Sequence, residues 1–186
     1  MRIIGGTRRG TKLAEIGPGD PAAHLRPTSD RVREAIFNLL TNSLHLNLTG
    51  LRVLDLFAGT GALGLEALSR GAAHVTFVDE GTTARTLLRR NIEVLRATDT
   101  TEPLRRDATR LGPNPGPPFN LIFLDPPYGK GLGETALASA QAGGWLAKGA
   151  TVVWEEGTAP TLPATMTSRI QRSYGETIVT ILSAPE

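Results

Sequence analysis

Cysteine is absent from the 186 residues of this chain, which excludes disulfide bonds, thiolate nucleophiles and zinc–thiolate sites. Aromatic residues make up only 5% of the sequence, and no stretch approaches the ~20 apolar residues that a membrane-spanning helix requires. The first ten residues, MRIIGGTRRG, lack the apolar core of a signal peptide, so nothing indicates export. These absences fit a cytoplasmic protein without a membrane segment, which is the localisation we expect.

Neither sign of charge is in large excess. The formal net charge is +2 although the sequence pI is 9.4, because 17 of the 20 basic residues are arginine, which does not titrate in this range. Arginine suits phosphate contacts, but a GC-rich genome would enrich it equally. The three histidines are scattered along the chain, so no metal site is expected. Basicity must therefore be sought locally.

The order of apolar and helical segments predicts an α/β fold. The runs RVLDLF, AHVTFVD, FNLIFLD and ATVVWEE indicate buried strands, and MTSRIQRSYGETIVTILSA indicates two strands joined near Tyr174–Gly175. Helical segments separate the first four runs, and one of them is expected to end near Trp145. Continuous apolar strands alternating with helices are typical of a mostly parallel sheet covered on both faces. We therefore expect one such domain over residues 28–186, with both tryptophans in its core.

Upstream of that domain, residues 1–27 are predicted to form a basic extension. Residues 1–15 indicate two short strands around a glycine-bearing turn. The segment RPTSDRVREAIFNLL then has the apolar spacing of an amphipathic helix, which Ser29 or Asp30 can cap after Pro27.

Four aspartates are predicted to meet at one edge of the sheet. Each lies at or just beyond a predicted strand end, and the carboxyl ends of parallel strands share an edge where ligands bind. We call this edge the carboxyl rim. Its aspartates are Asp55, Asp79, Asp107 and Asp125.

The glycine loop in LDLFAGTGALG raises the question of which nucleotide it binds. Its G-x-G-x-x-G spacing is also met in ordinary tight turns between a strand and a helix. Asp79 follows Gly59 by 20 residues, where an acid can bind ribose hydroxyls. Asp55, directly before the loop, would repel a pyrophosphate. A phosphate-free cationic adenosine ligand such as S-adenosylmethionine fits better, and the glycines then let the backbone approach it closely.

The tetrapeptide DPPY at residues 125–128 follows the strand FNLIFL. Its two prolines lack N–H donors, which leaves nearby carbonyls free to accept hydrogen bonds. Asp125 adds an acceptor, and Tyr128 offers a flat face for stacking a base. A ring-bound amino group that donates both hydrogens to Asp125 and the Pro126 carbonyl can direct its lone pair at a methyl group. The plainer alternative is a rigid proline turn that only ends the strand.

Together these motifs resemble the class I S-adenosylmethionine-dependent methyltransferases that methylate amino groups. The segments MRIIGGTRRG, RPTSDRVREAIFNLL, LDLFAGTGALGLEALSRGA and FLDPPY resemble the RsmD family more specifically. The resemblance covers nearly the whole chain. It implies the strand order 3-2-1-4-5-7-6 and S-adenosylmethionine as the methyl donor. It also implies transfer to the exocyclic N2 of one guanine in the 16S rRNA of the bacterial small ribosomal subunit, or of its assembly intermediate.

The resemblance also implies roles for individual residues. Asp125, Pro126, Pro127 and Tyr128 would hold the target guanine, which is swung out of its surroundings. Asp79 or its neighbour Glu80 would bind the ribose, and Asp107 would lie beside the adenine, although it also fits as a helix-capping aspartate. The full predicted cofactor-binding set is Asp55, Phe57, Ala58, Gly59, Thr60, Gly61, Asp79, Glu80, Asp107 and Ala108.

A basic surface near the N-terminus is predicted to contact RNA. Arg8, Arg9 and Lys12 could pair with phosphates, or equally be a solvated turn. Arg26 and Arg31 flank the start of the amphipathic helix, where they and the nearby Thr28 and Asp30 could lie near the RNA or the cofactor, or simply charge a helix terminus.

Three other functions remain open on sequence alone. The same DPPY chemistry serves methyltransferases of DNA adenine N6 and of protein glutamine amides, although no large DNA-recognition domain is evident. A dinucleotide reductase is disfavoured by Asp55. A non-catalytic RNA-binding protein is disfavoured by the intact DPPY.

Overall fold

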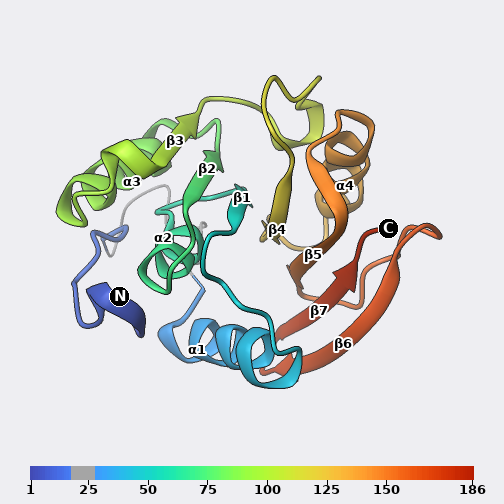
Figure 1. Ribbon diagram of the computed structural model, residues 1–186, viewed down its shortest axis with the longest axis horizontal. Helices are drawn as coiled ribbons and strands as arrows, with labels where there is room; N and C mark the ends of the chain where they lie inside the picture. Colours follow the sequence, from blue (N-terminus) through green and yellow to red (C-terminus); the bar gives the residue numbers. More distant parts are fainter. Residues whose placement is uncertain (18–27) are drawn as a thin grey trace.

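The strands of the protein form a seven-stranded sheet in the order β3-β2-β1-β4-β5-β7-β6 within the ranges that the computed structural model describes, residues 1–17 and 28–186 (Figure 1). Neighbouring strands from β3 to β5 are parallel, whereas β7 runs antiparallel to both β5 and β6. This confirms the predicted α/β class and the strand order that the family resemblance implied. The strands are β1 (Arg52–Leu56), β2 (His74–Val78), β3 (Thr101–Leu104), β4 (Phe119–Leu124), β5 (Leu146–Glu156), β6 (Thr167–Tyr174) and β7 (Thr177–Ser183).

Alternate residues of the central strands enter two hydrophobic cores. Val53 and Phe123 belong to the core that includes side chains of α1, α2 and α3, whereas Leu54 and Ile122 belong to the core that includes α4. This alternation is the two-residue period of a strand. Because both faces of the sheet are covered, the sequences of these strands are mostly apolar. The helices are α1 (Asp30–Asn38), α2 (Ala62–Ser69), α3 (Thr82–Val94) and α4 (Leu132–Ala142), with a π-helical turn, η3 (Leu39–Ser43), after α1.

Several predicted elements differ from the observed ones in their boundaries. Helix α4 ends at Ala142 rather than near Trp145, because Gly143 and Gly144 follow and Trp145 leads directly into β5. Both tryptophans lie in the core, as expected. The final hairpin turns at Gly175, which has a φ of +62°, again as expected.

The N-terminal segment does not form the two predicted strands. Arg2 and Lys12 make a single antiparallel bridge, and the residues between them include a short 3-10 helix, η1 (Gly6–Arg8). Ile3 and Leu13 are buried in the core shared with α1 and α2. The two arms of this segment are joined by a few backbone hydrogen bonds, such as those from Ile3 to Thr11 at 2.9 Å and from Leu13 to Met1 at 3.1 Å, and not by a continuous ladder. The proposed boundary between residues 27 and 28 stays a prediction, because residues 18–27 lie outside the described ranges.

Helix α1 begins as the sequence predicted. The hydroxyl oxygen of Ser29 accepts a hydrogen bond from the backbone N–H of Val32 at 3.2 Å, which caps the first turn. Ser29, and not Asp30, is therefore the capping residue. Among the described residues, no helix is long and apolar enough to cross a membrane.

Candidate functional site

The glycine loop connects β1 to α2 at the carboxyl rim. Gly61 precedes the helix with a φ of +80°, and a side chain there would collide with Leu88. A side chain on Gly64 would collide with Phe77 and Val75, so this glycine lets α2 lie close to β2. Gly59 has a φ of +57° but faces open space, since no atom approaches a Cβ there more closely than 4.0 Å. The loop thus combines close packing behind it with room in front of Gly59.

Asp55 lies at the end of β1 beneath this loop. Its Oδ2 accepts a hydrogen bond from the backbone N–H of Gly64 at 2.9 Å, and its side chain is almost fully buried. Burial raises the pKa of Asp55 well above its usual range, and the nearby carboxylates of Asp125 and Asp79 raise it further. Three of the four predicted carboxyl groups therefore lie close together at the rim.

Asp79 and Glu80 follow β2, and the structure distinguishes their surroundings. Asp79 accepts hydrogen bonds from the backbone N–H groups of Gly59 at 2.9 Å and Gly81 at 2.8 Å, so it ties the glycine loop to the start of α3. Glu80 is exposed. Of the two predicted ribose ligands, Asp79 is the one in contact with the loop.

Phe57, Ala58 and Thr60 complete the loop. Phe57 has a φ of +57°, an uncommon conformation for a bulky residue. The backbone N–H of Ala58 donates to the Val78 carbonyl, which brings the loop against the end of β2. Thr60 is buried, and its carbonyl accepts from the Asn91 side chain on α3.

Asp107 caps a 3-10 helix, η5 (Ala108–Arg110), after β3. Its Oδ1 accepts from both the backbone N–H and the hydroxyl of Thr109, and these bonds lower the pKa of Asp107. Ala108 is buried in the core on the α4 face. The capping arrangement that the sequence left open is present, and Asp107 still lies just beyond a strand at the rim.

Asp125 lies at the end of β4 and lines a pocket of about 240 Å³. Its Oδ2 accepts a hydrogen bond from the hydroxyl of Thr28 at 3.0 Å, and the same hydroxyl lies 3.1 Å from Oε1 of Glu155 at the end of β5. Burial raises the pKa of Asp125 to about 7, opposed by the Thr28 bond. Three segments far apart in the chain therefore meet at this carboxylate.

The other three residues of DPPY shape the same pocket. Pro126 is buried and Pro127 is exposed. The Tyr128 hydroxyl lies 3.1 Å from that of Thr177, and the ring lies beside Gly157, where a Cβ would come within 3.1 Å of it. Partial burial raises the pKa of Tyr128 to about 12, so the phenol is neutral at physiological pH. Tyr128 is 37% exposed, which leaves part of it open to solvent.

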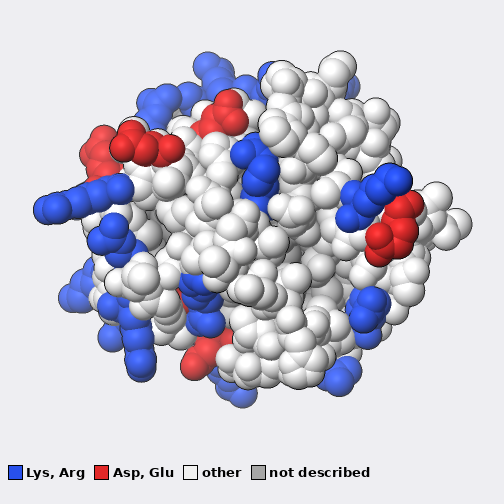
Figure 2. Space-filling model, in the orientation of Figure 1, with Lys and Arg blue, Asp and Glu red and all other residues white. Residues whose placement is uncertain are grey.

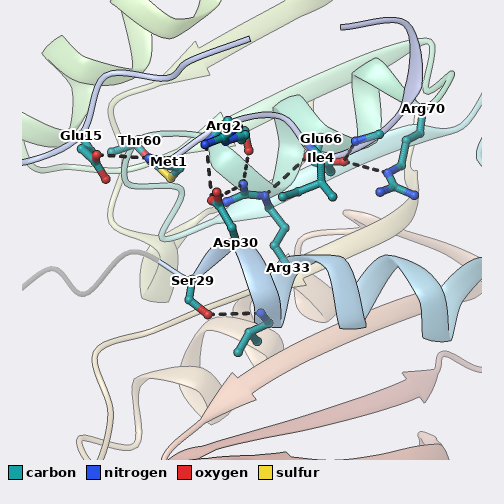
Figure 3. Close-up of polar contacts among 12 residues, drawn as sticks. Met1, Arg2, Ile4, Glu15, Ser29, Asp30, Arg33, Thr60, Glu66 and Arg70 are labelled. Carbon is teal, nitrogen blue, oxygen red and sulfur yellow. Dashed lines mark hydrogen bonds and ion pairs between the residues drawn. The ribbon is translucent and has the colours of Figure 1, made fainter. Parts of the chain in front are cut away.

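The basic residues of the N-terminal segment are exposed but lie away from the pocket. Ile4 and Gly5 are bound by Glu66 in the middle of α2, and the backbone N–H of Arg8 donates to Ser69 at its end (Figure 3 shows the Glu66 contacts). Helix α2 starts at the rim and spans about 12 Å. Arg8 and its neighbour Arg9 therefore lie at the far end of α2 from the glycine loop.

Lys12 and Arg31 are exposed closer to the rim. Lys12 pairs with Arg2 near Met1, whose sulfur lies 3.9 Å from the Thr60 hydroxyl. Arg31 is in the first turn of α1, between the pocket residues Ser29 and Val32. Arg26 lies outside the described residues. In Figure 2, basic side chains lie mainly around the margin of this face.

Sequence reasoning missed Glu155 and undervalued Thr28. Glu155 is only 2% exposed, and burial together with the charge of Asp125 raises its pKa well above the usual range. The sequence signal was an acidic pair ending an apolar strand, WEE, at the edge already predicted to hold the other carboxylates. No group of acidic residues and histidines among the described residues is arranged to hold a metal ion.

Comparison with solved structures defines the class of protein. The chain superposes on the crystal structure of PH1948 from Pyrococcus horikoshii with a TM-score of 0.72 over 94% of each chain, at 17% identity. It superposes on yhhF from Escherichia coli with a TM-score of 0.82 at 35% identity, covering 100% of this chain and 98% of that one. With its sheet order and glycine loop, the protein has the class I methyltransferase fold.

Sequence comparison then identifies the family. A family model described as "Conserved hypothetical protein 95" matches residues 1–183. The chain is 37% identical over 179 residues to "Ribosomal RNA small subunit methyltransferase D" of Escherichia coli K12, covering 95% of this chain and 86% of that protein. It is 36% identical over 158 residues to the protein of the same name in Haemophilus influenzae, covering 83% and 78%. The chain belongs to this family, the RsmD family that its motifs resembled.

Proposed function

We propose that this protein transfers a methyl group from S-adenosylmethionine to the exocyclic N2 of one guanine in 16S rRNA, in the small ribosomal subunit or an assembly intermediate of it. The observation that carries the proposal is the position of Asp125: a carboxylate with one oxygen anchored by Thr28, in a pocket that Tyr128 also lines. The names of the relatives from Escherichia coli and Haemophilus influenzae, ribosomal RNA small subunit methyltransferases, support ribosomal RNA as the substrate.

The carboxyl rim fits S-adenosylmethionine, which supplies an electrophilic methyl group on a sulfonium. Gly59 leaves space for a ligand at the loop, and Asp79, already attached to the loop backbone, has further lone pairs for ribose hydroxyls. The neighbouring carboxyl groups of Asp55, Asp79 and Asp125 already disfavour one another's charge, so this edge disfavours a pyrophosphate and favours a cationic donor. We assign Asp79, rather than the exposed Glu80, to the ribose.

Asp125 and the DPPY backbone orient the target amine in the proposed reaction. Oδ2 of Asp125 accepts the hydrogen bond from Thr28, and in the proposed complex Oδ1 accepts one N2 hydrogen of guanine while the Pro126 carbonyl accepts the other. These two bonds draw the nitrogen lone pair out of the ring, and Tyr128 stacks against the base. Water can take the proton released after transfer. The contribution of the protein is positioning and hydrogen bonding.

The proposal is tested by incubating the protein with labelled S-adenosylmethionine and with small ribosomal subunits from cells that lack this protein. We expect label on N2 of a single guanine after the modified base is mapped. Label on DNA adenine or a protein glutamine amide, offered in parallel, would support one of the alternative amino methyltransferases. Calorimetric binding of NAD without binding of S-adenosylmethionine would overturn the assignment altogether.

The basic N-terminal surface is expected to affect RNA binding more than the chemical step. Replacing Arg8, Arg9 and Lys12 with alanine should raise the KM for RNA and reduce the salt slope of binding by about 0.7–0.9 for each phosphate that the variant no longer neutralises. The kcat at saturating RNA should change little, because Arg8 and Arg9 lie at the far end of α2 from the loop. Binding titrations at several salt concentrations measure the slope.

A double variant of Lys148 and Arg169 is the control for that measurement. Both residues are exposed. Lys148 lies near the start of β5 and Arg169 near the start of β6, at the ends of these strands that are away from the carboxyl rim. If the control reduces the salt slope as much as the N-terminal variant, the effect is one of overall charge and the N-terminal turn is simply solvated.

A further inference from the structure

The Thr28 hydroxyl is placed between two carboxyl groups. Its oxygen lies 3.0 Å from Oδ2 of Asp125 and 3.1 Å from Oε1 of Glu155. A hydroxyl has a single hydrogen to donate, whereas an ionised carboxylate can only accept. Both contacts are full hydrogen bonds only when one carboxyl group is protonated and donates to the Thr28 oxygen. One shared proton would therefore satisfy both contacts fully.

The groups facing this arrangement are mostly acidic. Asp55 from β1 acts on Glu155 and Glu156 acts on Asp125, and both disfavour ionisation. The buried guanidinium of Arg33 on α1 has the opposite effect on Glu155. Tyr128 and Glu176 line the same pocket. Among the residues that the structure describes, three acids (Asp55, Glu156 and Glu176) and one basic group (Arg33) lie near the pair, so keeping one proton in it limits repulsion at the end of the sheet.

We propose that Glu155 keeps the shared proton and donates it to Thr28, and that Thr28 in turn donates to Asp125. Glu155 is thereby a positioning residue for Asp125 in the methyl transfer proposed above, on which this inference rests. The chain of two hydrogen bonds fixes Oδ2 of Asp125 and leaves Oδ1 directed to the target amine. When Glu155 loses its proton, Thr28 can satisfy only one carboxylate, and the two charges repel each other.

The order in which the two groups ionise favours Glu155 as the proton carrier. Glu155 is only 2% exposed, whereas Asp125 is partly exposed at the pocket, so ionising Glu155 costs more desolvation. Asp125 thus ionises first as pH rises, and Glu155 stays protonated beside it. The working state has Asp125 charged and Glu155 neutral.

The pH dependence of methyl transfer tests this proposal. We expect the rate for the wild-type protein to rise through about pH 7 as Asp125 ionises, and to fall at higher pH as Glu155 loses its proton. Glu155→Gln mimics the neutral acid and can still donate to Thr28, so it should keep the rise, keep most of the maximal rate and lose the fall. A fall of equal size in both proteins would overturn the proposal.

Two further variants separate the hydrogen-bond chain from general effects of charge. Thr28→Val keeps the shape but removes the hydroxyl, and it should lower kcat by about tenfold to a hundredfold through misplacement of Asp125. Glu156→Gln is the matched control for Glu155→Gln, because Glu156 binds the backbone N–H groups of Gly129 and Gly157 and not Thr28. It should retain the fall in rate at high pH. A wild-type kcat in Thr28→Val would contradict the proposal.

A measurement without substrate distinguishes failure of this inference from failure of the proposed function. At about one pH unit above the Asp125 pKa, the infrared spectrum of the free protein should contain protonated-carboxyl absorption that is weaker in Glu155→Gln, where only the contribution of other buried acids such as Asp55 remains. Equal bands in the two proteins would remove the shared proton whatever the substrate proves to be. A band that behaves as expected, without methylation of small subunits, would leave the shared proton standing and reject the guanine assignment.

Discussion

Asp125→Ala is expected to lower the rate of methyl transfer by about a hundredfold or more, the effect of losing one preorganised polar contact at a transition state. The substitution removes the only carboxylate within DPPY and leaves the Thr28 hydroxyl with Glu155 alone among the described residues. Binding of S-adenosylmethionine should survive, because the glycine loop and Asp79 do not depend on Asp125 for their contacts. Single-turnover kinetics measure the first effect and calorimetry the second.

Asp99→Ala is the matched control for this variant. Asp99 is an exposed aspartate in the 3-10 turn η4 (Thr98–Thr100) just before β3, so it lies at the amino end of a strand, away from the carboxyl rim. The rate of methyl transfer by Asp99→Ala should match that of the wild-type protein. Turnover by Asp125→Ala that equals the control would remove Asp125 from the mechanism, and loss of cofactor binding would show that the substitution disturbs the rim as a whole.

The sheet could be predicted from the sequence wherever a strand is buried on both faces. Strands β1, β2 and β4 are mostly apolar, so their positions and the carboxyl rim followed directly. Strand β3 was not located among the apolar runs, because it is an edge strand whose Glu102 and Pro103 are exposed. The prediction of two N-terminal strands was wrong. The segment is held in place by Glu66 and by the burial of Ile3, and no local sequence pattern encodes these distant contacts.

The candidate site could be predicted only as far as its motifs reach. The glycine loop and DPPY are local, and their residues lie at the rim where parallel strands end. The contacts of Thr28 with Asp125 and Glu155 join residues that are 97 and 127 positions apart in the sequence. No single motif contains Thr28 together with either carboxylate. In the sequence, Thr28 before α1 resembles an ordinary helix-capping residue, and the acidic pair at the end of β5 resembles ordinary surface residues. Only the fold brings them together.

Glu66, like Thr28, could not be singled out from the sequence, because its partners Ile4 and Gly5 are distant along the chain. It is fully buried on α2. Its two oxygens accept hydrogen bonds from the backbone N–H groups of Ile4 and Gly5 and from Arg70, each at 2.8 Å, and Arg33 on α1 lies 3.6 Å away. One carboxylate therefore joins the N-terminal segment, α1 and α2 (Figure 3).

Glu66→Ala is expected to lower the free energy of unfolding by about 3–5 kcal/mol, because it leaves two backbone donors and Arg70 without their acceptor and removes one of the two carboxylates beside the buried guanidinium of Arg33. Removing one partner of a buried ion pair costs far more than an exposed substitution, which usually changes stability by less than about 0.5 kcal/mol. Glu93→Ala, at an exposed position near the end of α3, provides that reference. Urea unfolding of the two variants measures the difference. A loss of under about 1 kcal/mol in Glu66→Ala would mean that water or a rearranged side chain replaces the carboxylate, and that the N-terminal segment is held mainly by the burial of Ile3 and Leu13.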